Sequence, residues 1–343
     1  MTNATTRKDT GTMLTHSRVT VSKGFLTVGI STLALFVVSA LLAPSSVSQG
    51  AVLGMLPFAA VLAIVGLGQM LVVQQGGIDL SIPGAVSLAI VIVSHEPNGD
   101  NSKLVPAIFL ALAWAIGAGL ANGFMIGRLG LSPIIATLGT NALLFGAVLG
   151  ISGGTPRGTT KLLASVAGGL TFGIPNSIYF AVVALILVSL LVKKSVAGRR
   201  FEAIGANPAA AKVIGLRVRV HQAAAYVWAQ LLYCLAGVLL AGITAQPTAF
   251  QGDAYLLPAV AVVVLGGTSL LGGRGFPVAT VIAALFLTQL DQFVLALGVP
   301  YAVRDLVQAA ALGIGVALYT VNWPAIRQRF SRKPRTLATV TAS

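Results

Sequence analysis

Acidic side chains are scarce in this chain, which has eight Asp and Glu residues against 22 Lys and Arg residues in 343 positions. Charged residues make up only 9% of the sequence, whereas a soluble domain carries about 25%. The composition therefore excludes an ordinary soluble fold. A single cysteine, Cys234, excludes an intrachain disulfide, and its place in an apolar run predicts a small packing residue.

Motifs for nucleotide hydrolysis and for metal binding are also missing from the sequence. The stretch "GGTPRGTTK" lacks the Gly-Lys pair of a phosphate-binding loop. The three histidines, His16, His95 and His221, are scattered, and "SHEPN" lacks the second histidine of a zinc-protease motif. We therefore expect no catalytic residue, no metal site and no cofactor bound by this chain.

Long apolar runs dominate what is present: 56% of the residues are hydrophobic and the mean hydropathy is +0.91. A transmembrane helix needs about 20 mostly apolar residues, and several runs approach or exceed that length. We predict an all-α polytopic membrane protein with about 10 transmembrane helices. The expected spans are 24–43, 51–74, 77–95, 104–126, 133–151, 176–192, 223–244, 256–271, 277–295 and 302–321.

The net charge of +14 would suggest a nucleic-acid partner in a soluble protein. In a membrane protein it has a simpler explanation, because cytoplasmic loops collect Lys and Arg. With both termini cytoplasmic, the inward segments carry 18 of the 22 basic residues. We predict cytoplasmic tails over 1–23 and 322–343, a membrane domain over 24–321, and no nucleic-acid binding.

The stretch "QQGGIDLSIPG" places an acidic residue, Asp79, between two long apolar runs. The run after Pro83 is too short to cross the membrane at about 1.5 Å per residue, so we predict a broken helix near Gly76–Ser81. Gly76 and Gly77 free the backbone to break, and Asp79 or Ser81 can cap the helix that restarts near Pro83. Asp79 is either such a cap or a residue of the transport path.

Other polar residues lie within the predicted spans. Thr137 and Asn141 share one face of the fifth span at i, i+4 spacing, and Thr140 lies in the same span. Asn122 lies in the fourth span and Gln230 in the seventh. These residues either form helix–helix hydrogen bonds or line the path of a hydroxyl-rich solute. Both alternatives stay open from the sequence.

Two further stretches combine polar and small residues. Gly266 and Thr268 belong to "GGTSLLGGRG", which is either a close helix crossing with a tight turn or part of a cytoplasmic gate. The ninth span ends in "TQLDQF", which clusters Thr288, Gln289, Asp291 and Gln292 toward the outer side.

The longest cytoplasmic connection, residues 193–222, contains its own helix signals. Asn207 reads as an N-cap with Pro208 at the first helical position, and Gly215 stands where a C-terminal glycine belongs. We predict a short helix from Pro208 to Ile214. By spacing alone it is either an interfacial helix on the lipid headgroups or a docking helix for a partner protein.

Four stretches in order resemble the ribose-type permeases of ATP-binding cassette (ABC) transporters. The resemblance covers about residues 50 to 320. The stretches are "QQGGIDLSIPG" at 74–84, "ANGFMIGRLGLSPIIATLGT" at 121–140, "GRRFEAIGANPAAAKVIGLRV" at 198–218 and "AVAVVVLGGTSLLGGRG" at 259–275.

The resemblance implies an inner-membrane permease that works as a homo- or heterodimer. A separate cytoplasmic ATPase would bind ATP and Mg²⁺, and a periplasmic binding protein would deliver a monosaccharide. It also favours the docking role for the short cytoplasmic helix. The implied coupling residues are Glu202, Gly205, Asn207, Pro208, Ala210 and Gly215. The candidate pathway or helix-break residues, predicted above from the residues themselves, are Gly76, Gly77, Asp79, Ser81, Asn122, Thr137, Asn141, Gly266 and Thr268.

Two alternatives remain for the function. A permease of the same fold could import a nucleoside or a branched-chain amino acid, although the uncharged Thr/Asn stripe favours a sugar. An ion-coupled secondary carrier would use a carboxylate at the membrane midplane, as Asp79 offers, and paired broken helices. The second half of the sequence shows no matching break with a carboxylate.

Overall fold

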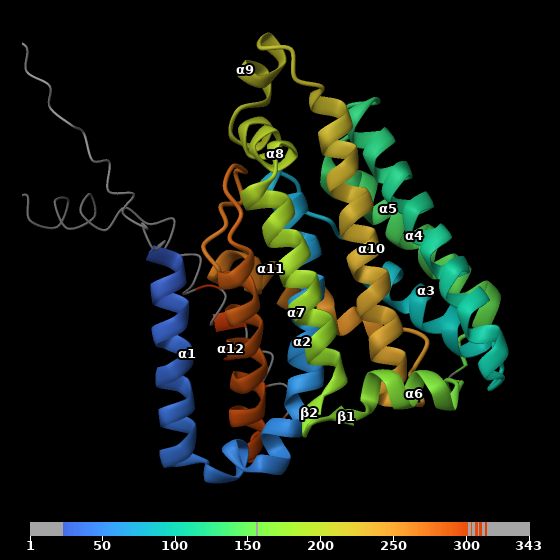
Figure 1. Ribbon diagram of the computed structural model, residues 1–343, viewed down its shortest axis with the longest axis vertical. Helices are drawn as coiled ribbons and strands as arrows, with labels where there is room; N and C mark the ends of the chain where they lie inside the picture. Colours follow the sequence, from blue (N-terminus) through green and yellow to red (C-terminus); the bar gives the residue numbers. More distant parts are fainter. Residues whose placement is uncertain are drawn as a thin grey trace, which may run out of the picture.

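The computed structural model describes residues 23–155 and 157–300, together with 303, 306, 307, 309, 310 and 313. Within these residues the chain is almost entirely helical (Figure 1). The longer helices are α1 (Lys23–Leu42), α2 (Gln49–Gln74), α3 (Ile82–His95), α4 (Leu104–Gly127), α5 (Pro133–Ser152), α7 (Asn176–Ser189), α10 (Val218–Thr244), α11 (Leu256–Leu265) and α12 (Pro277–Ala296).

The remaining elements are short. They are the helices α6 (Lys161–Gly168), α8 (Val196–Ala206) and α9 (Pro208–Val213), the 3₁₀ turns η1 (Pro44–Val47), η2 (Asn101–Lys103) and η4 (Gln251–Tyr255), the π-helical turn η3 (Leu190–Lys194), and the strands β1 (Leu170–Thr171) and β2 (Ile174–Pro175). The two strands pair antiparallel, with Leu170 opposite Pro175.

Seven helical segments in the described part of the chain are long and apolar enough to cross a membrane. Each matches a predicted span, so the prediction of an all-α polytopic membrane protein is confirmed. The third and eighth predicted spans correspond to the shorter apolar segments Ile82–His95 and Gln251–Leu265. Most of the tenth, 302–321, lies outside the described residues, as do residues 1–22 and the C-terminal tail, so the count of ten and the side of the termini stay predictions.

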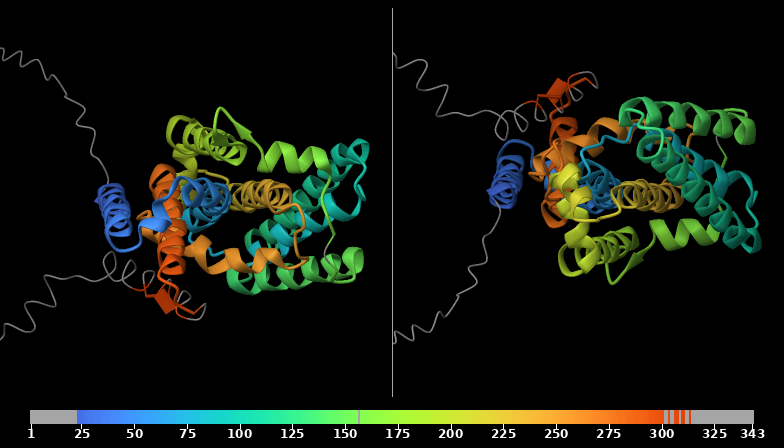
Figure 2. Two further views of the ribbon diagram at one scale, coloured as in Figure 1. Left: turned by 90° about the horizontal axis from the view of Figure 1, so that it is seen from below. Right: turned by 90° about the horizontal axis from the view of Figure 1, so that it is seen from above.

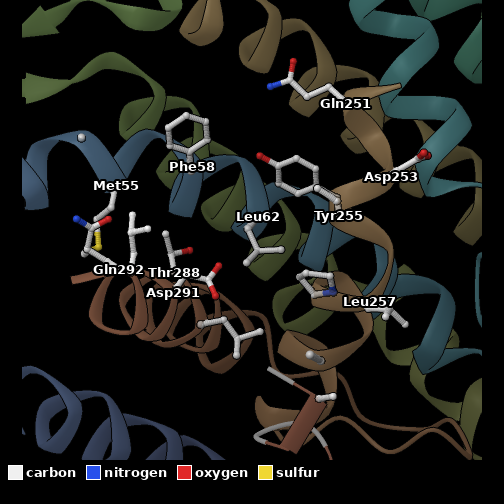
Figure 3. A pocket seen from close by; sticks show the side chains of 17 residues that line it. Met55, Phe58, Leu62, Gln251, Asp253, Tyr255, Leu257, Thr288, Asp291 and Gln292 are labelled. Carbon is white, nitrogen blue, oxygen red and sulfur yellow. The ribbon is translucent and has the colours of Figure 1, made fainter. Parts of the chain in front are cut away.

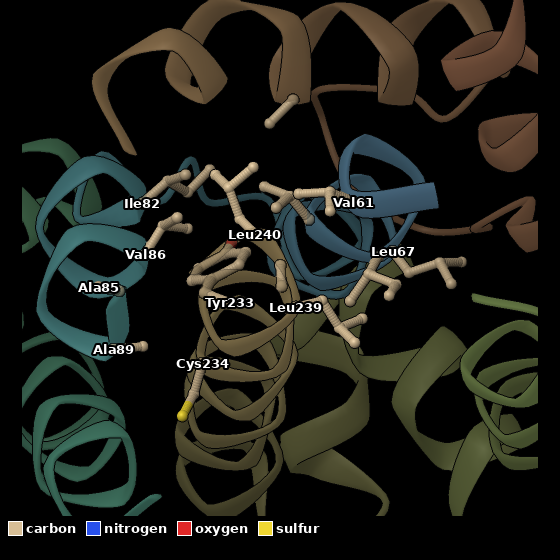
Figure 4. Close-up of a cluster of buried hydrophobic side chains, with 14 of the residues drawn as sticks. Val61, Leu67, Ile82, Ala85, Val86, Ala89, Tyr233, Cys234, Leu239 and Leu240 are labelled. Carbon is tan, nitrogen blue, oxygen red and sulfur yellow. The ribbon is translucent and has the colours of Figure 1, made fainter. Parts of the chain in front are cut away.

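Helices α2 and α10 form the centre of the bundle. Helix α10 packs against α2, α3, α4 and α6, and α2 packs against α7, α11 and α12. In the apolar 18-residue stretch of each helix, 56% of the residues are buried in α2 and 61% in α10, against 17% in α1. In Figure 2, α1 stands at one edge of the molecule and α4 and α5 at the opposite edge. Figure 4 shows Tyr233 and Leu240 of α10 between α3 and α2.

Small residues allow a close contact between α4 and α10. A Cβ added at Gly119 would lie 2.6 Å from Cα of Val227, and one at Gly123 would lie 2.6 Å from Cα of Ala223. Both glycines are in α4, and both neighbours are in α10. Helices in lipid associate through such close backbone approach because no hydrophobic force drives them together. The i, i+4 glycine pair therefore fixes α4 on α10.

The two ends of the bundle differ. Helices α8 and α9 cover one end, here named the α9 end, and α6 with the β1–β2 hairpin lies at the other (Figure 1). The loop between α11 and α12, residues 266–276, is here named the glycine loop and reaches the α9 end beside α8 (Figure 1).

Candidate functional site

A helix break connects α2 to α3, in the region predicted from Gly76–Ser81. Helix α2 ends at Gln74 and α3 begins at Ile82. Gly76 has φ +78°, in the left-handed region that favours glycine. A Cβ at Gly77 would collide with the Tyr226 hydroxyl. The two glycines therefore permit the turn and the close approach of α10.

Asp79 lies at the centre of a buried polar network and is fully buried. Its Oδ1 accepts hydrogen bonds from the Ser81 backbone N–H, at 2.8 Å, and from the Ser81 hydroxyl, at 2.5 Å. Its Oδ2 accepts from Nε2 of Gln230 at 3.3 Å. No Lys or Arg among the described residues forms an ion pair with Asp79. The carboxylate is therefore held by donors from its own turn and from α10.

The network continues into the neighbouring helices. The Ser81 Oγ accepts from Nε2 of Gln230 at 2.7 Å and from Nδ2 of Asn122 at 3.3 Å. The Oδ1 of Asn122 accepts from the Thr140 hydroxyl at 2.5 Å. Since Ser81 Oγ accepts from two amides, its single proton is donated to Asp79. The bond directions thus suit an ionised carboxylate at Asp79.

Two residues of the network, Gln69 and Tyr233, were not predicted from the sequence. The Oε1 of Gln69 accepts from the Asp79 backbone N–H at 3.3 Å and from the Tyr233 hydroxyl at 3.0 Å. The one signal that could have identified Gln69 is its position as a lone amide in the apolar run of α2.

The polar stripe of α5 caps the start of α3. Thr137 Oγ1 accepts from the Leu80 N–H at 2.9 Å, and Asn141 Oδ1 accepts from the Gly84 N–H at 2.8 Å. The prediction that Asp79 or Ser81 caps α3 is therefore wrong in detail. Ser81 occupies the N-cap position but makes no side-chain capping bond, because its hydroxyl oxygen already accepts from Gln230 and Asn122. Asn141, from a different helix, accepts the N–H of the first turn instead.

Four of the predicted path residues are buried and hydrogen-bonded in this network. Asn122 and Thr137 are fully buried, as are Asp79 and Ser81, and each has a hydrogen-bond partner in the network. The structure thus shows the helix–helix hydrogen bonds that were one of the two alternatives. Their contact with a solute stays a prediction.

The glycine loop joins α11 to α12, and its first residue lies close to the start of α12. A Cβ at Gly266 would lie 2.9 Å from the Thr280 backbone nitrogen. The Thr268 hydroxyl accepts from the Phe276 N–H at 3.3 Å and so bridges the two ends of the loop. Gly266 and Thr268 thus have the crossing-and-turn geometry, and a gating role for them stays a prediction.

The predicted cytoplasmic helix is present as α9. The Asn207 side chain accepts from the Ala210 N–H at 3.0 Å, Pro208 is the first helical residue, and Gly215 follows with φ +82°. Helix α9 ends one residue earlier than predicted, at Val213. The side chains of Val213 and Ile214 are 87% and 72% exposed. Helix α9 therefore presents an apolar tip to its surroundings.

Helix α8, which the sequence does not predict, turns Glu202 and Gly205 toward the bundle. Glu202 Oε1 accepts from Nε of Arg274 in the glycine loop at 2.8 Å. Gly205 is buried against the carbonyl of Gln74. The implied contact of Glu202 with an ATPase stays a prediction, and its partner within this chain is Arg274.

A cavity of about 750 Å³ lies between α2, η4 with α11, and α12. Figure 3 shows Met55, Phe58 and Leu62 of α2 facing the polar groups of η4 and α12. The polar lining residues are Gln251, Asp253, Tyr255, Thr288, Asp291 and Gln292. The lining comes from the first half of α2 and the second half of α12, so the cavity lies away from the α9 end.

None of the predicted path residues lines this cavity. The cluster in "TQLDQF" contributes Thr288, Asp291 and Gln292 to the lining, whereas η4 was not expected to contribute. The fourth polar residue of the cluster, Gln289, is buried elsewhere and donates to the Ser39 hydroxyl at 3.1 Å. The volume falls within the range of about 300–1,000 Å³ that is typical of small-molecule sites. The cavity is therefore the candidate binding site for a small solute.

The fold and the site together define a polytopic helical membrane protein with a solute-sized cavity and two short helices, α8 and α9, at one end of the bundle. The comparisons with known proteins name the class. Residues 51–315 match the family described as "Branched-chain amino acid transport system / permease component". The chain belongs to this family.

Curated relatives give the same result. The chain is 33% identical over 277 residues to a probable ABC transporter permease protein, y4mJ, of Sinorhizobium fredii, which covers 80% of this chain and 83% of the relative. It is 34% identical over 289 residues to the ribose import permease protein RbsC of Bacillus subtilis, with 83% and 89% covered. It is 33% identical over 312 residues to the autoinducer 2 import system permease protein LsrC of an Enterobacter strain, with 90% and 89% covered. No solved structure matches the chain.

The chain is therefore a multi-pass permease subunit of an ABC importer of the bacterial inner membrane. The resemblance to ribose-type permeases noted from four sequence stretches is confirmed.

Proposed function

We propose that this permease carries a monosaccharide or a related polyol inward after delivery by a periplasmic binding protein. The cavity is the observation that carries the proposal. Its lining combines a tyrosine and a phenylalanine ring with hydroxyl, amide and carboxylate groups. Sugar hydroxyls need such donors and acceptors, and their C–H faces pack on aromatic rings. Relatives named for ribose and for autoinducer 2 support the same class.

The charge of the lining argues against a branched-chain amino acid. Its carboxylate would favour a basic side chain or a helix N-terminus. The start of α11 at Leu256 borders the cavity, but the described lining residues include two aspartates and no Lys or Arg. A nucleoside is the second candidate, because Phe58 and Tyr255 offer aromatic faces for a base. An ion-coupled carrier is disfavoured, because Asp79 is fully buried in a hydrogen-bond network and does not line the cavity.

ATP would be bound and hydrolysed on a separate subunit. The sequence has no phosphate-binding loop, so ATP and Mg²⁺ belong to that ATPase. With the α9 end cytoplasmic, helix α9 would dock in a cleft of the ATPase through Val213 and Ile214. The cavity would then open toward the periplasmic half, where the binding protein releases its solute. We further propose two permease copies in each transporter.

Reconstitution tests this function. The permease is placed in proteoliposomes with its cognate ATPase and binding protein, and uptake of labelled ribose, a nucleoside and leucine is compared. We expect ATP-dependent uptake of the sugar. Uptake driven by an ion gradient without the ATPase would refute the ABC mechanism, and ATP-dependent uptake of leucine alone would refute the sugar.

A further inference from the structure

Three segments distant in the sequence touch through their backbones at the α9 end. They are the end of α2 at Gln74 and Gln75, the end of α8 at Gly205, and the glycine loop at Gly272 and Gly273. We name this contact the glycine junction. The Gly273 N–H donates to the Gln74 carbonyl at 2.9 Å, and Nε2 of Gln75 donates to the Phe201 carbonyl at 2.9 Å.

Glycine is required for these contacts. A Cβ at Gly205 would collide with the Gln74 carbonyl oxygen, and one at Gly272 would lie 2.6 Å from the Gly205 carbonyl oxygen. Gly272 and Gly273 also have φ values of +90° and +102°, which side chains disfavour. Backbone, rather than a flexible side chain, occupies each contact, so α8 cannot shift without moving its neighbours.

Side chains reinforce the junction on its outer surface. Arg274 of the glycine loop pairs with Glu202 of α8 at 2.8 Å. Lys193 lies above the ring of Phe276, with its Nζ 5.2 Å from the ring centroid. Helix α8 thus contacts Arg274, and the segment before α8 contacts Phe276 through Lys193.

The junction leads directly to the helix break. Gln75 and Gly76 begin the turn in which Asp79 and Ser81 bind α10 and α4, and Leu80 binds α5. The side chain of Gln74 is fully buried, and both of its amide atoms lack a hydrogen-bond partner in this conformation. A buried amide without partners is unfavourable. A shift of the glycine junction could therefore give the Gln74 amide hydrogen-bond partners that it lacks in this conformation.

We propose that the glycine junction passes the displacement of α8 and α9 to the α2–α3 break, with Gly205 and Gln75 as positioning residues. The inference rests on the proposed docking of an ATPase at α9. It assigns the connection to backbone contact between α8 and the end of α2, and the glycine loop holds the two together.

The test uses the full transporter in proteoliposomes with the variants Gly205→Ala and Gln75→Leu. The first adds a methyl group between α8 and Gln74, and the second removes the amide donor to Phe201 with little change in volume. Gly139→Ala in α5 is the matched control, because a Cβ there meets no atom within 4 Å. The readouts are ATPase co-purification, uptake, and the ratio of ATP hydrolysis with and without loaded binding protein.

We expect both variants to retain the ATPase on co-purification while uptake falls at least about tenfold and the hydrolysis ratio falls toward one. Gly139→Ala should match the wild type. Wild-type uptake in both variants would overturn the proposal. Loss of ATPase binding would also overturn it, because the junction would then only support the docking surface. If Gly205→Ala does not fold, Gln75→Leu decides. Failure of the proposed function itself would appear in the wild type, as absent ATP-dependent uptake.

Discussion

Replacing Asp79 separates a structural role of the buried network from a role in transport. Asp79→Ala removes the acceptor of two buried donors, the N–H and the O–H of Ser81. Each buried donor left without a partner costs about 1–3 kcal/mol, so the variant should lose about 2–6 kcal/mol of folding free energy. Gln230 is less affected, because its Nε2 keeps the 2.7 Å bond to Ser81.

Asp79→Asn is the informative companion. The asparagine keeps an oxygen in the position of Oδ1 for both Ser81 donors, but its NH2 group replaces Oδ2 and faces Nε2 of Gln230, donor against donor. Its expected cost is about 1–3 kcal/mol, the cost of one buried donor left without a partner. The control is Asp253→Asn, an exposed carboxylate for which a change within about 0.5 kcal/mol is expected.

The assay is thermal unfolding in detergent, followed by uptake in proteoliposomes. The midpoint should fall in the order wild type, Asp79→Asn, Asp79→Ala, with Asp253→Asn near the wild type. Asp79→Asn should keep most of its uptake. An unchanged midpoint for Asp79→Ala would refute the structural role. Full stability with no uptake in Asp79→Asn would show that the negative charge of Asp79 acts in transport.

Three further predictions follow from the same contacts. The Glu202–Arg274 pair has an exposed arginine and contributes at most about 1 kcal/mol to folding. Glu202→Arg and Arg274→Glu should therefore each impair uptake without unfolding the protein, and the double variant should restore uptake. A double variant that restores no uptake would place Glu202 against the ATPase instead. Asn207→Ala removes the cap on the Ala210 N–H, costs about 1 kcal/mol and should weaken ATPase co-purification, whereas Asn207→Ser should keep it; equal binding by both would contradict a docking role. Asp253→Ala should raise the solute concentration needed for half-maximal uptake without changing the unfolding midpoint, and unchanged uptake kinetics would remove the cavity from the path.

Local signals explain what could be predicted from the sequence. Span length identified the long helices, and the Gly76–Gly77 pair identified the break. Asn207 with Pro208 and the later Gly215 fixed α9 to within one residue, because capping depends on neighbours a few positions apart. None of these inferences needed a distant contact.

Partners far apart in the sequence could not be predicted in this way. Helical periodicity places Thr137 and Asn141 on one face but does not reveal that the face meets the start of α3. Glu202 and Arg274 are 72 positions apart, and nothing local connects them. The cavity is formed by α2, η4 and α12, so its carboxylate at Asp253 had no neighbouring motif to identify it.

The carboxylates of Asp79, Asp253 and Asp291 lie in two different settings, the buried hydrogen-bond network and the cavity. A carboxylate within the membrane costs a few kcal/mol unless it is paired, and Asp79 meets that condition through donors from its own turn and from α10. Asp253 and Asp291 line the cavity instead. Because the Asp79 network ties the break to α4, α5 and α10, a displacement that reaches the break from α8 would move these helices as a group. The solute would then be released by the changing shape of the cavity, with no charge transfer through Asp79.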